Sequence, residues 1–541
     1  MLLTRTLSLG LLVLTAGAGP SWAQTVVEDQ RLSEPTLLGD DRYGAAVDTS
    51  QGRMVVGAPN HDANGLQSGA VFVYASGGDG TWTPEQTLLS ADLAPNDLFG
   101  SAVCVVGDRI VVGAPRRDVG VFDEGAAYEF VRQGDGSWLE TDRFSALDGT
   151  PGDRFGASVA FDGDYAIVGA PADDPGGLGS SGSAYVFERQ PSGDWLQIEK
   201  LTSPAPGANR RFGRHVEIAG PFVVVGQEAA NAGEAGLDRL FVFLRQGDDY
   251  TLDAAIASPT PGQPGAQRFG VDFDLDAPRL IVGDPDSSAG GRAHVYERVA
   301  GTWTLVDTID AAPEVSEARV GASVALDGTT ALLGGPGDGV FEGRGVLFLE
   351  SVNGGWRELA DVEPDERSGV VPDEYGLCVE MDADGLVIGA PAFSDQGLAT
   401  GAAFAFRRGM LMHGHSRLGV GGGAQQDFLM LAGPENAVKF HWIVGSATGT
   451  SPGVVIAPTV VVPLVPDAYG ASTVFNAGLP PIVGSIGLLD ADGVSARSFV
   501  VPVGLSPALA GLTLHHAFLV YDPFTLFIEA SSNAVSLTLV P

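Results

Sequence analysis

Hydrophobic and polar residues alternate in short runs along the first three quarters of the chain, and glycine, proline or aspartate separates one run from the next. Within residues 154–187, Ala157, Val159 and Phe161 alternate with smaller or polar neighbours, whereas residues 166–168 are continuously apolar. Alternation is typical of a strand with one covered face, and a short continuous run is typical of a strand covered on both faces. We therefore expect small β-sheets with the continuously apolar strand in the middle.

A fourth strand in each unit begins near a tryptophan or tyrosine. In the third unit it spans residues 195–201, where polar and apolar residues alternate and two are charged. Charges within an alternating pattern are typical of an outer sheet edge. Each unit is thus predicted to contain four short strands.

Three landmarks recur in these units: an aromatic residue followed by Gly, then Gly-Ala-Pro, then a strand ending in aromatic residues. The first landmark returns at intervals of 51 to 57 residues, at Tyr43, Phe99, Phe155, Phe212, Phe269, a degenerate Val320, and Tyr375. In copies four and six the Gly-Ala-Pro landmark is incomplete, because Gly226 is followed by Gln227 and Gly335 by Pro336. Four-stranded sheets repeated seven times bury their faces only against neighbouring copies, which predicts a seven-bladed β-propeller.

The seventh copy lacks a fourth strand of its own, because it runs from Phe406 into Arg407, Arg408 and Gly409. Residues 26–32, ahead of the first copy, resemble the fourth strand at residues 84–89. We therefore expect the N-terminal strand to complete the last blade and close the ring, which removes free sheet edges.

Composition divides the chain into four expected parts. Residues 1–23 combine an early arginine, an apolar run and a small-x-small site, which is typical of a secretory signal peptide. Residues 24–407 are the expected propeller, and residues 408–426 the expected Gly-rich linker. Residues 427–541 hold few charges and many short apolar runs between Gly and Pro, which predicts a C-terminal β-sandwich domain in an all-β protein.

Acidic residues outnumber basic ones by 67 to 30, and the formal net charge is −37. Such a charge repels nucleic-acid phosphates and anionic membrane surfaces, so neither is an expected partner. No segment after the signal peptide offers the roughly 18 uninterrupted apolar residues of a membrane span. The expected location is outside the cell or at its surface, where the acidity serves solubility or attracts divalent cations or a basic partner.

Only two cysteines are present, which excludes a disulfide-rich scaffold. Cys104 and Cys378 follow the aromatic of their copies by five and three residues, so they share a strand face. A bridge between them and two unpaired buried thiols both stay open.

The aromatic-Gly pair followed by Gly-Ala-Pro resembles the FG-GAP repeat, the blade unit of the integrin alpha-chain head propeller and of many exported bacterial proteins. The resemblance spans residues 26–406 in seven ordered copies. With Asp-Gly-Asp before the central strand and Gly-Ser-Ala-Tyr-Val-Phe after it, the third copy is most similar to the bacterial branch. The resemblance implies a propeller.

Integrin-type blades bind calcium in an Asp-x-Asp/Asn-x-Asp-Gly loop between the first two strands of a blade. Here that connection is too short, and no copy contains the complete motif. Calcium is therefore not carried over, and no other cofactor is expected. The remaining candidate metal ligands are Asp162, Asp164, Asp382 and Asp384, for which a β-turn built on Asp-Gly is the alternative explanation.

Longer loops follow Gly-Ala-Pro, and repetition gathers them on one rim of the propeller. They contain the candidate binding residues Asp62, Asn64, Asp173, Asp174 and Asp395. Solvated turn side chains explain such residues, whereas contact with a cation or a partner is the functional alternative, since loops on a rigid scaffold often carry binding.

No catalytic residue is predicted, because the chain contains no His-Glu-x-x-His, no Gly-x-Ser-x-Gly elbow and no Walker loop in a suitable context. We expect a secreted, non-catalytic binding, adhesion or structural protein whose rim loops bind an extracellular protein or polysaccharide. The alternative is an extracellular hydrolase or lyase with an acidic site on one propeller face. That alternative requires carboxylates, His or Arg that converge at the mouth of the propeller.

Overall fold

A computed structural model describes the protein over residues 24–540, apart from residues 28–29, 35, 78–80, 229–237, 248, 260–267, 287–289, 312–318, 338–342, 365–372, 384, 396–397, 408–410, 414–416, 420–424, 438, 448–453, 458–459, 463–481, 484–485, 501–511, 522–527 and 533–534. The predicted signal peptide, residues 1–23, lies outside the described residues. Within the described part the regular structure is β-strand, except for the 3-10 turns η1 (Pro175–Gly177) and η3 (Pro434–Asn436). The all-β prediction is confirmed.

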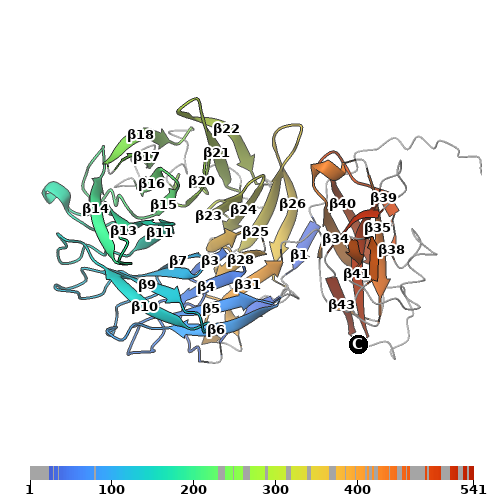
Figure 1. The fold of residues 1–541 in the computed structure, drawn as a ribbon, viewed down its shortest axis with the longest axis horizontal. Helices are drawn as coiled ribbons and strands as arrows, with labels where there is room; N and C mark the ends of the chain where they lie inside the picture. Colours follow the sequence, from blue (N-terminus) through green and yellow to red (C-terminus); the bar gives the residue numbers. More distant parts are fainter. Residues whose placement is uncertain are drawn as a thin grey trace, which may run out of the picture.

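Seven sheets, each built around four antiparallel strands, are arranged as blades around a central axis (Figure 1). The predicted seven-bladed β-propeller is therefore confirmed. The innermost strands are β3 (Ala46–Ser50), β7 (Ala102–Val106), β11 (Ser158–Asp162), β15 (Val216–Ala219), β19 (Phe273–Asp276), β23 (Ser323–Asp327) and β27 (Cys378–Met381). Each of them contacts the innermost strand of the next blade, and β27 contacts β3, so the seven form a complete ring.

The middle strands of each blade are almost entirely buried, as their apolar runs predict. The second strands are β4 (Arg53–Ala58), β8 (Arg109–Ala114), β12 (Tyr165–Ala170), β16 (Phe222–Gln227), β20 (Arg279–Asp284), β24 (Thr330–Gly335) and β28 (Gly385–Ala390). The third strands are β5 (Ala70–Ser76), β9 (Ala126–Arg132), β13 (Ser183–Arg189), β17 (Arg239–Gln246), β21 (Arg292–Val299), β25 (Arg344–Glu350) and β31 (Ala402–Arg407).

The fourth strands lie at the outer edge and expose most of their polar residues. They are β6 (Trp82–Leu88), β10 (Trp138–Phe144), β14 (Trp195–Thr202), β18 (Asp249–Ala257), β22 (Thr302–Asp310) and β26 (Trp356–Glu363). The register shifts once between the third and fourth strands of each of these six blades. Such bulges increase local twist and help an outer strand to follow the curvature of its blade.

The hydrophobic core consists of clusters between neighbouring blades. Val73 and Val103, for example, belong to one cluster although they come from blades one and two, and Val111 and Val168 join blades two and three in the next. Each blade is therefore stabilised mainly by its two neighbours, as in other repeat architectures.

The landmark glycines allow the blades to approach closely. Gly57 is the glycine of Gly-Ala-Pro in the first blade, and a Cβ atom at this position would collide with the carbonyl group of Gly100 in the aromatic-Gly pair of the second. The same contact joins Gly389 of the seventh blade to Gly44 of the first. Repeated close packing of backbone on backbone explains why both landmarks require glycine.

The N-terminal segment forms two short strands rather than one. β2 (Gln30–Leu32) pairs antiparallel with β31 at the outer edge of the seventh sheet. β1 (Gln24–Val27) pairs parallel with β26 of the sixth sheet, and it also contacts β34 (Gln425–Leu431). Residues 26 and 27, which the sequence assigns to the strand of the last blade, therefore belong to β1.

The C-terminal part contains two larger sheets beside the propeller (Figure 1). One is formed by β32 (Leu411–His413), β34, β40 (Val494–Val500) and β38 (Ile482–Val483). The other is formed by β33 (Arg417–Gly419), β43 (Val535–Val540), β41 (Thr513–Tyr521), β35 (Phe440–Ser446), β39 (Ile486–Leu488) and β42 (Ile528–Ser531). Side chains of β34, β35, β41 and β43 share one hydrophobic cluster.

Shorter pairings complete the described strands: β29 (Ser394–Asp395) with β30 (Leu398–Ala399), and β36 (Val454–Ala457) with β37 (Val460–Val462). β32 and β33 fall within residues 408–426, the stretch predicted as a linker, and both pair with C-terminal strands. The backbone amide and carbonyl groups of β32 and β33 pair with other strands, which the glycine content of this segment does not predict.

Polar contacts connect the sixth blade to the C-terminal part. The guanidinium of Arg357 lies 2.8 Å from Asp490, and the carboxylate of Asp492 accepts hydrogen bonds from the Ser351 hydroxyl and the Val352 amide.

Among the described helices, none has the length and apolar character needed to cross a membrane.

Candidate functional site

The antiparallel order of the strands places two kinds of connection on opposite faces of the propeller. Hairpin turns join the first to the second strand and the third to the fourth on one face. The longer connections, from the second to the third strand and from one blade to the next, lie on the other face. We call this second face the loop face. It contains the five candidate binding residues.

Backbone hydrogen bonds fasten the loops of neighbouring blades to one another. The amide of Asn96 donates to the carbonyl of Leu66 at 2.8 Å, and that of Gly152 donates to Phe122 at 3.0 Å. The amide of Asn209 donates to Gly179 at 2.8 Å in the same way. The loops of the first three blades are therefore rigidly held by the start of the following blade.

The candidate binding residues mostly stabilise the loops in which they lie. Asp62 accepts a hydrogen bond from the Gln67 amide at 2.7 Å, and Asp174 accepts one from the Ser180 amide at 2.5 Å. The amide group of the Asn64 side chain donates to the Ser90 carbonyl at 3.1 Å.

Asp173 is buried, with its carboxylate 2.8 Å from Lys200 and 3.2 Å from the Tyr185 hydroxyl. Asp395 lies in the short strand β29, where its backbone pairs with Leu398. The structure thus distributes the five candidates over the loops of blades one, three and seven, and does not assemble them into one site.

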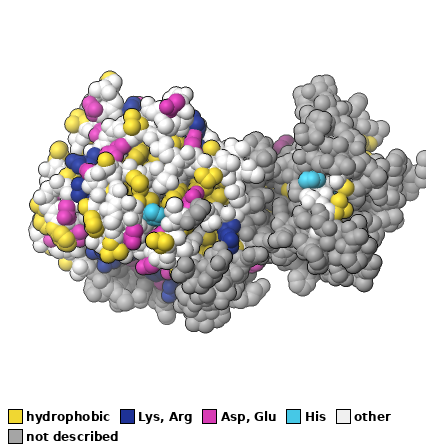
Figure 2. Space-filling view, turned by 90° about the horizontal axis from the view of Figure 1, so that it is seen from below, with side chains coloured by type: hydrophobic (Ala, Val, Ile, Leu, Met, Phe, Trp, Pro, Cys, Tyr) yellow, Lys and Arg dark blue, Asp and Glu magenta, His cyan; other side chains and the backbone are white. Residues whose placement is uncertain are grey.

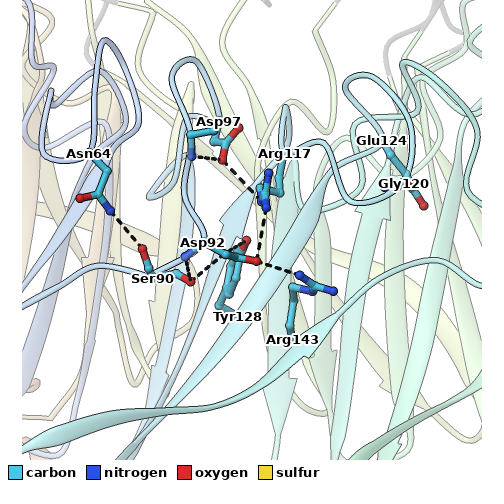
Figure 3. A network of polar contacts seen from close by, with 10 residues as sticks. Asn64, Ser90, Asp92, Asp97, Arg117, Gly120, Glu124, Tyr128 and Arg143 are labelled. Carbon is cyan, nitrogen blue, oxygen red and sulfur yellow. Dashed lines mark hydrogen bonds and ion pairs between the residues drawn. The ribbon is translucent and has the colours of Figure 1, made fainter.

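A polar network around Asp92 shows how the loop face is held together (Figure 3). The Asp92 carboxylate accepts hydrogen bonds from Ser90 and Tyr128, and it pairs with Arg143 at 2.8 Å and Arg117 at 3.4 Å. Burial opposes ionisation of Asp92, but the hydrogen bonds from Ser90 and Tyr128 and the two guanidinium groups together lower its pKa. The charged carboxylate therefore joins the inter-blade loop to β9 and β10.

Apolar side chains project from these fixed loops into solvent. Leu66 is 63% exposed, Phe122 70% and Leu147 80%. We call the exposed apolar residues of this region the apolar rim: Leu38, Leu66, Val121, Phe122, Leu147 and Leu178. Figure 2 shows one face of the molecule, on which hydrophobic, acidic and basic side chains are intermixed over the described part of the propeller.

A second group of polar residues lies in the central ring of innermost strands. Five residues after the aromatic of each copy, these strands carry Asp48, Cys104, Ala160, Glu217, Asp274, Ala325 and Glu380. Because the innermost strands contact one another around the axis, four carboxylates from blades one, four, five and seven converge there. Along the chain, each of the four carboxylates is separated from the next by about one repeat or more. The only sequence signal for the cluster is therefore that all four follow the aromatic residue of their copy by five positions.

Two of these four carboxylates, and that of Asp162 in β11, cap the exposed edge of the next innermost strand. Asp48 accepts a hydrogen bond from the Val105 amide at 2.6 Å, and Asp274 accepts one from the Leu326 amide at 2.6 Å. Asp162 accepts one from the Gly220 amide in the same manner. An innermost strand has an unpaired edge, and these side chains satisfy amides that would otherwise lack a partner.

The candidate metal ligands have similar structural roles. Asp162 is an edge cap, and Asp382 accepts a hydrogen bond from the Gly385 amide at 2.9 Å within its turn. Asp164 is exposed at the turn after β11, and Asp384 lies outside the described residues. In the part of the chain that the structure describes, no group of three or more His, Cys, Asp or Glu residues has a geometry that could hold a metal ion.

The electrostatics of the central ring favour protonated carboxyl groups. Burial raises the pKa of Asp48 to about 7, although the Val105 and Thr49 amides favour its ionised form. Burial and the charge of Glu217 raise the pKa of Asp274 to about 8. Burial, together with the charges of Asp48 and Asp274, raises the pKa of Glu380 well above its ordinary value.

His215 provides a positive charge within this ring. Its Nε2 atom lies 3.3 Å from the carboxylate of Asp272 and 3.4 Å from that of Glu217. Burial opposes protonation of His215, but these two carboxylates outweigh it and raise its pKa to about 9. Carboxyl groups whose pKa lies near 7, beside a protonated histidine, have the charge states that general acid–base chemistry uses.

Both cysteines are free thiols. The thiol of Cys378 donates to the Gly44 carbonyl at 3.1 Å, and burial raises its pKa. Burial and the charges of Asp48 and Glu217 raise the pKa of Cys104 well above its ordinary value. Neither thiol is suited to act as a nucleophile, because the reactive form is the thiolate.

These observations define a seven-bladed β-propeller with a rigid loop face and an acidic central ring. Three stretches, residues 27–74, 82–130 and 138–187, match the FG-GAP repeat. The chain is an FG-GAP repeat β-propeller protein. A search of curated proteins found no matching sequence.

Two solved structures show a partial likeness to this chain. The periplasmic gluconolactonase of Pseudomonas aeruginosa is 16% identical with a TM-score of 0.38, and the likeness covers 62% of this chain and 92% of that one. A protein assigned as a 6-phosphogluconolactonase from Bacteroides fragilis is 12% identical with a TM-score of 0.37, covering 62% of this chain and 90% of that one. At these values neither likeness bears on the activity of this chain.

Proposed function

We propose that this protein is an exported, non-catalytic binding protein that holds a protein partner on the apolar rim of its loop face. The observation that carries the proposal is the exposure of Leu66, Phe122 and Leu147 on loops that backbone hydrogen bonds hold in place. Burying apolar surface is favourable by about 25 cal/mol per Å². Loops that are already ordered lose little conformational entropy on binding.

Two features favour a protein over a polysaccharide and suggest its chemistry. The apolar rim is mainly aliphatic, and apolar side chains of this kind are buried at the centre of protein interfaces. Exposed Asp62, Asp118 and Asp174 surround it on the same loops. The partner is therefore expected to present an apolar centre bordered by basic residues.

We further propose an architecture for the whole chain, with export directed by residues 1–23. In this architecture β2 closes the ring by completing the seventh blade, and residues 24–407 form the propeller. The pairing of β2 with β31 supports the closure. The cluster shared by β34, β35, β41 and β43 supports a C-terminal β-sandwich, which would act as a spacer or attachment module.

The rim proposal is tested by binding of the full chain to arrayed extracellular proteins and polysaccharides. A triple variant, Leu66→Ser, Phe122→Ser and Leu147→Ser, is expected to weaken binding of its protein partner at least about a hundredfold, because interface energy concentrates in a few apolar anchors.

The matched control is Leu139→Ser, Leu196→Ser and Leu252→Ser, which removes comparably exposed side chains from the outer strands β10, β14 and β18. It is expected to bind as the native protein does. Equal binding by native and rim variants, or binding to polysaccharides alone, would contradict the proposal.

The second candidate function is an extracellular hydrolase or lyase, which the convergence of Asp48, Glu217, Asp274 and Glu380 favours. Glu380 would act as the general acid, because a raised pKa keeps its proton available near neutrality. Release of reducing ends from an acidic polysaccharide by the native protein, lost in Glu380→Gln, would support this candidate. Absence of turnover with both forms would remove it.

A further inference from the structure

Blade four departs from the repeat at one location on the loop face. Arg214 and His215 take the places of Ala45 and Ala46 in the first copy, and Gln227 and Glu228 take those of Ala58 and Pro59. In the first three copies the corresponding residues are alanine, serine or proline. Four replacements by longer polar residues therefore meet where two landmarks of the blade lie side by side.

These residues line a pocket between blades four and five with a volume of about 190 Å³. The start of the fifth blade contributes Phe269, Gly270 and Val271 to the lining of the pocket. Arg268, which directly precedes them in the chain, also lines it. Drug-sized ligands occupy cavities of roughly 300–1,000 Å³. The pocket therefore matches a single small group.

The walls of the pocket are held by contacts within the blade. Glu228 pairs with Arg214 and, at 3.2 Å, with Arg211. Gln227 is buried, and its side chain contacts the Ser203 hydroxyl and the Ala205 carbonyl. The polar groups that line this side of the pocket are thus fixed before any ligand arrives.

Arg268 differs from the other guanidinium groups of the pocket. Among the described residues it has neither an ion pair nor a hydrogen bond. It is half-buried and lies close enough to Arg214 for the two charges to repel. Two arginines therefore flank the pocket, and only Arg214 has a carboxylate partner.

The charge of the pocket opposes the charge of the protein. Arg211, Arg214 and Arg268 gather here against the carboxylates of Glu228 and Asp238, whereas the charge of His215 is balanced by Asp272 and Glu217. Burial and the charges of Arg268 and Arg211 lower the pKa of Arg214, so these cations destabilise one another. A chain with a net charge of −37 would not collect cations at one point by composition alone.

We propose that this pocket binds one anionic oxygen group, a carboxylate, sulfate or phosphate, between Arg214 and Arg268. The planar guanidinium fork matches such oxyanions in two parallel hydrogen bonds. An anion also relieves the repulsion between the arginines. The bound group is a free oxyanion or the acid group of one sugar residue, and its binding does not depend on the partner proposed for the apolar rim.

Calorimetric titration of the full chain tests the proposal with four probes: inorganic sulfate, inorganic phosphate, glucuronate and neutral glucose. We expect at least one anion to bind, glucose not to bind, and affinity to fall as salt is raised, because salt screens the attraction. Binding of glucuronate without sulfate or phosphate would assign the site to sugar acids. Binding of sulfate or phosphate without glucuronate would assign it to free or esterified oxyanions.

Arg268→Gln is the decisive variant, because it removes a charge without breaking a contact. Its affinity for the bound anion is expected to fall about tenfold or more, with an unchanged unfolding temperature. Arg154→Gln, which removes an exposed arginine from the corresponding loop of blade three, is the matched control and should bind as the native protein does. Absence of anion binding by the native protein, or native affinity in Arg268→Gln, would overturn the proposal.

Because the rim proposal is tested by leucine and phenylalanine variants in blades one to three, the two proposals succeed or fail separately. A rim variant that loses its protein partner but still binds the anion confirms that the pocket is intact.

Discussion

Individual acidic residues in this protein have two kinds of environment, and the difference sets their charge. Asp92 on the loop face accepts hydrogen bonds and pairs with arginines, and its pKa is lowered. Asp48 and Asp274 lie in the central ring, where burial outweighs the backbone amides that they cap and their pKa is raised. One residue type thus provides a permanent charge in one place and a protonated group in another.

These shifts predict how stability depends on pH. A carboxyl group whose folded pKa is raised stabilises the fold below its unfolded pKa, and this contribution is lost as pH rises toward 7 for Asp48 and 8 for Asp274. Loss of the proton from His215, as pH rises through about 9, acts in the same direction. The unfolding temperature is therefore expected to fall by several degrees between about pH 5 and pH 9.

The double variant Asp48→Asn and Asp274→Asn tests this explanation by thermal unfolding across that range. Asparagine retains an oxygen for the Val105 and Leu326 amides but does not ionise. A flatter profile is expected from it, with the residual slope due to Glu217, Glu380, Cys104 and His215, which face the same ring. A native profile that rises between pH 5 and pH 9 would refute the assignment.

At the scale of the element, the blade depends on glycine at the points where two backbones meet. Gly156 follows the aromatic of the third copy, has a φ of +87°, and would direct a Cβ atom at the carbonyl group of Ala126 in the second blade. Gly163 also has a positive φ, +63°, but no atom lies within 4 Å of the position of its Cβ. Substitutions at these two glycines therefore distinguish the free-energy cost of a left-handed backbone from the additional cost of a steric collision.

Gly156→Ala is expected to lower the free energy of unfolding by about 3 kcal/mol or more, because backbone strain and steric overlap add. Gly163→Ala is expected to cost about 1 kcal/mol, the strain alone. Urea unfolding of the two variants measures both. Equal losses would show that close packing between blades is not the reason for the landmark glycine.

The sequence predicted the strands well because their signals are local. The alternation around Val159 and the apolar run at residues 166–168 correspond to β11 and β12, and Trp195 begins the outer strand β14. The functional residues were harder to recognise. Asp62 and Asp173 stand out along the chain, yet the structure uses them within their own loops. Arg268 and Arg214 are inconspicuous, and only folding brings them to one pocket.

At the scale of the whole molecule, the ring joins residues from the two ends of the propeller sequence. Leu32 of β2 is only 2% exposed and belongs to the same cluster as Val387 and Ala405 of the seventh blade and Val56 of the first. The N-terminal segment therefore contributes to the last interface of the ring as well as to the seventh sheet.

Leu32→Asp is expected to lower the free energy of unfolding by about 3 kcal/mol or more, since it would bury a charge without a partner. Leu38→Asp is the control, because Leu38 is exposed six residues further along and its substitution should change stability by no more than about 0.5 kcal/mol. Similar stability of the two variants would show that the N-terminal strand does not secure the ring.

The sequence by itself determined the number of blades, the order of their strands and the positions of their glycine landmarks, because periodicity and backbone geometry act over a few residues. Tertiary structure decided where β1 and β2 pair and which aspartates accept hydrogen bonds from backbone amides of a neighbouring strand. It also decided which charged side chains lie together in the central ring and beside Arg268. Those outcomes depend on distances between residues about one blade or more apart. Such distances are set by closure of the ring, which no single stretch of sequence contains.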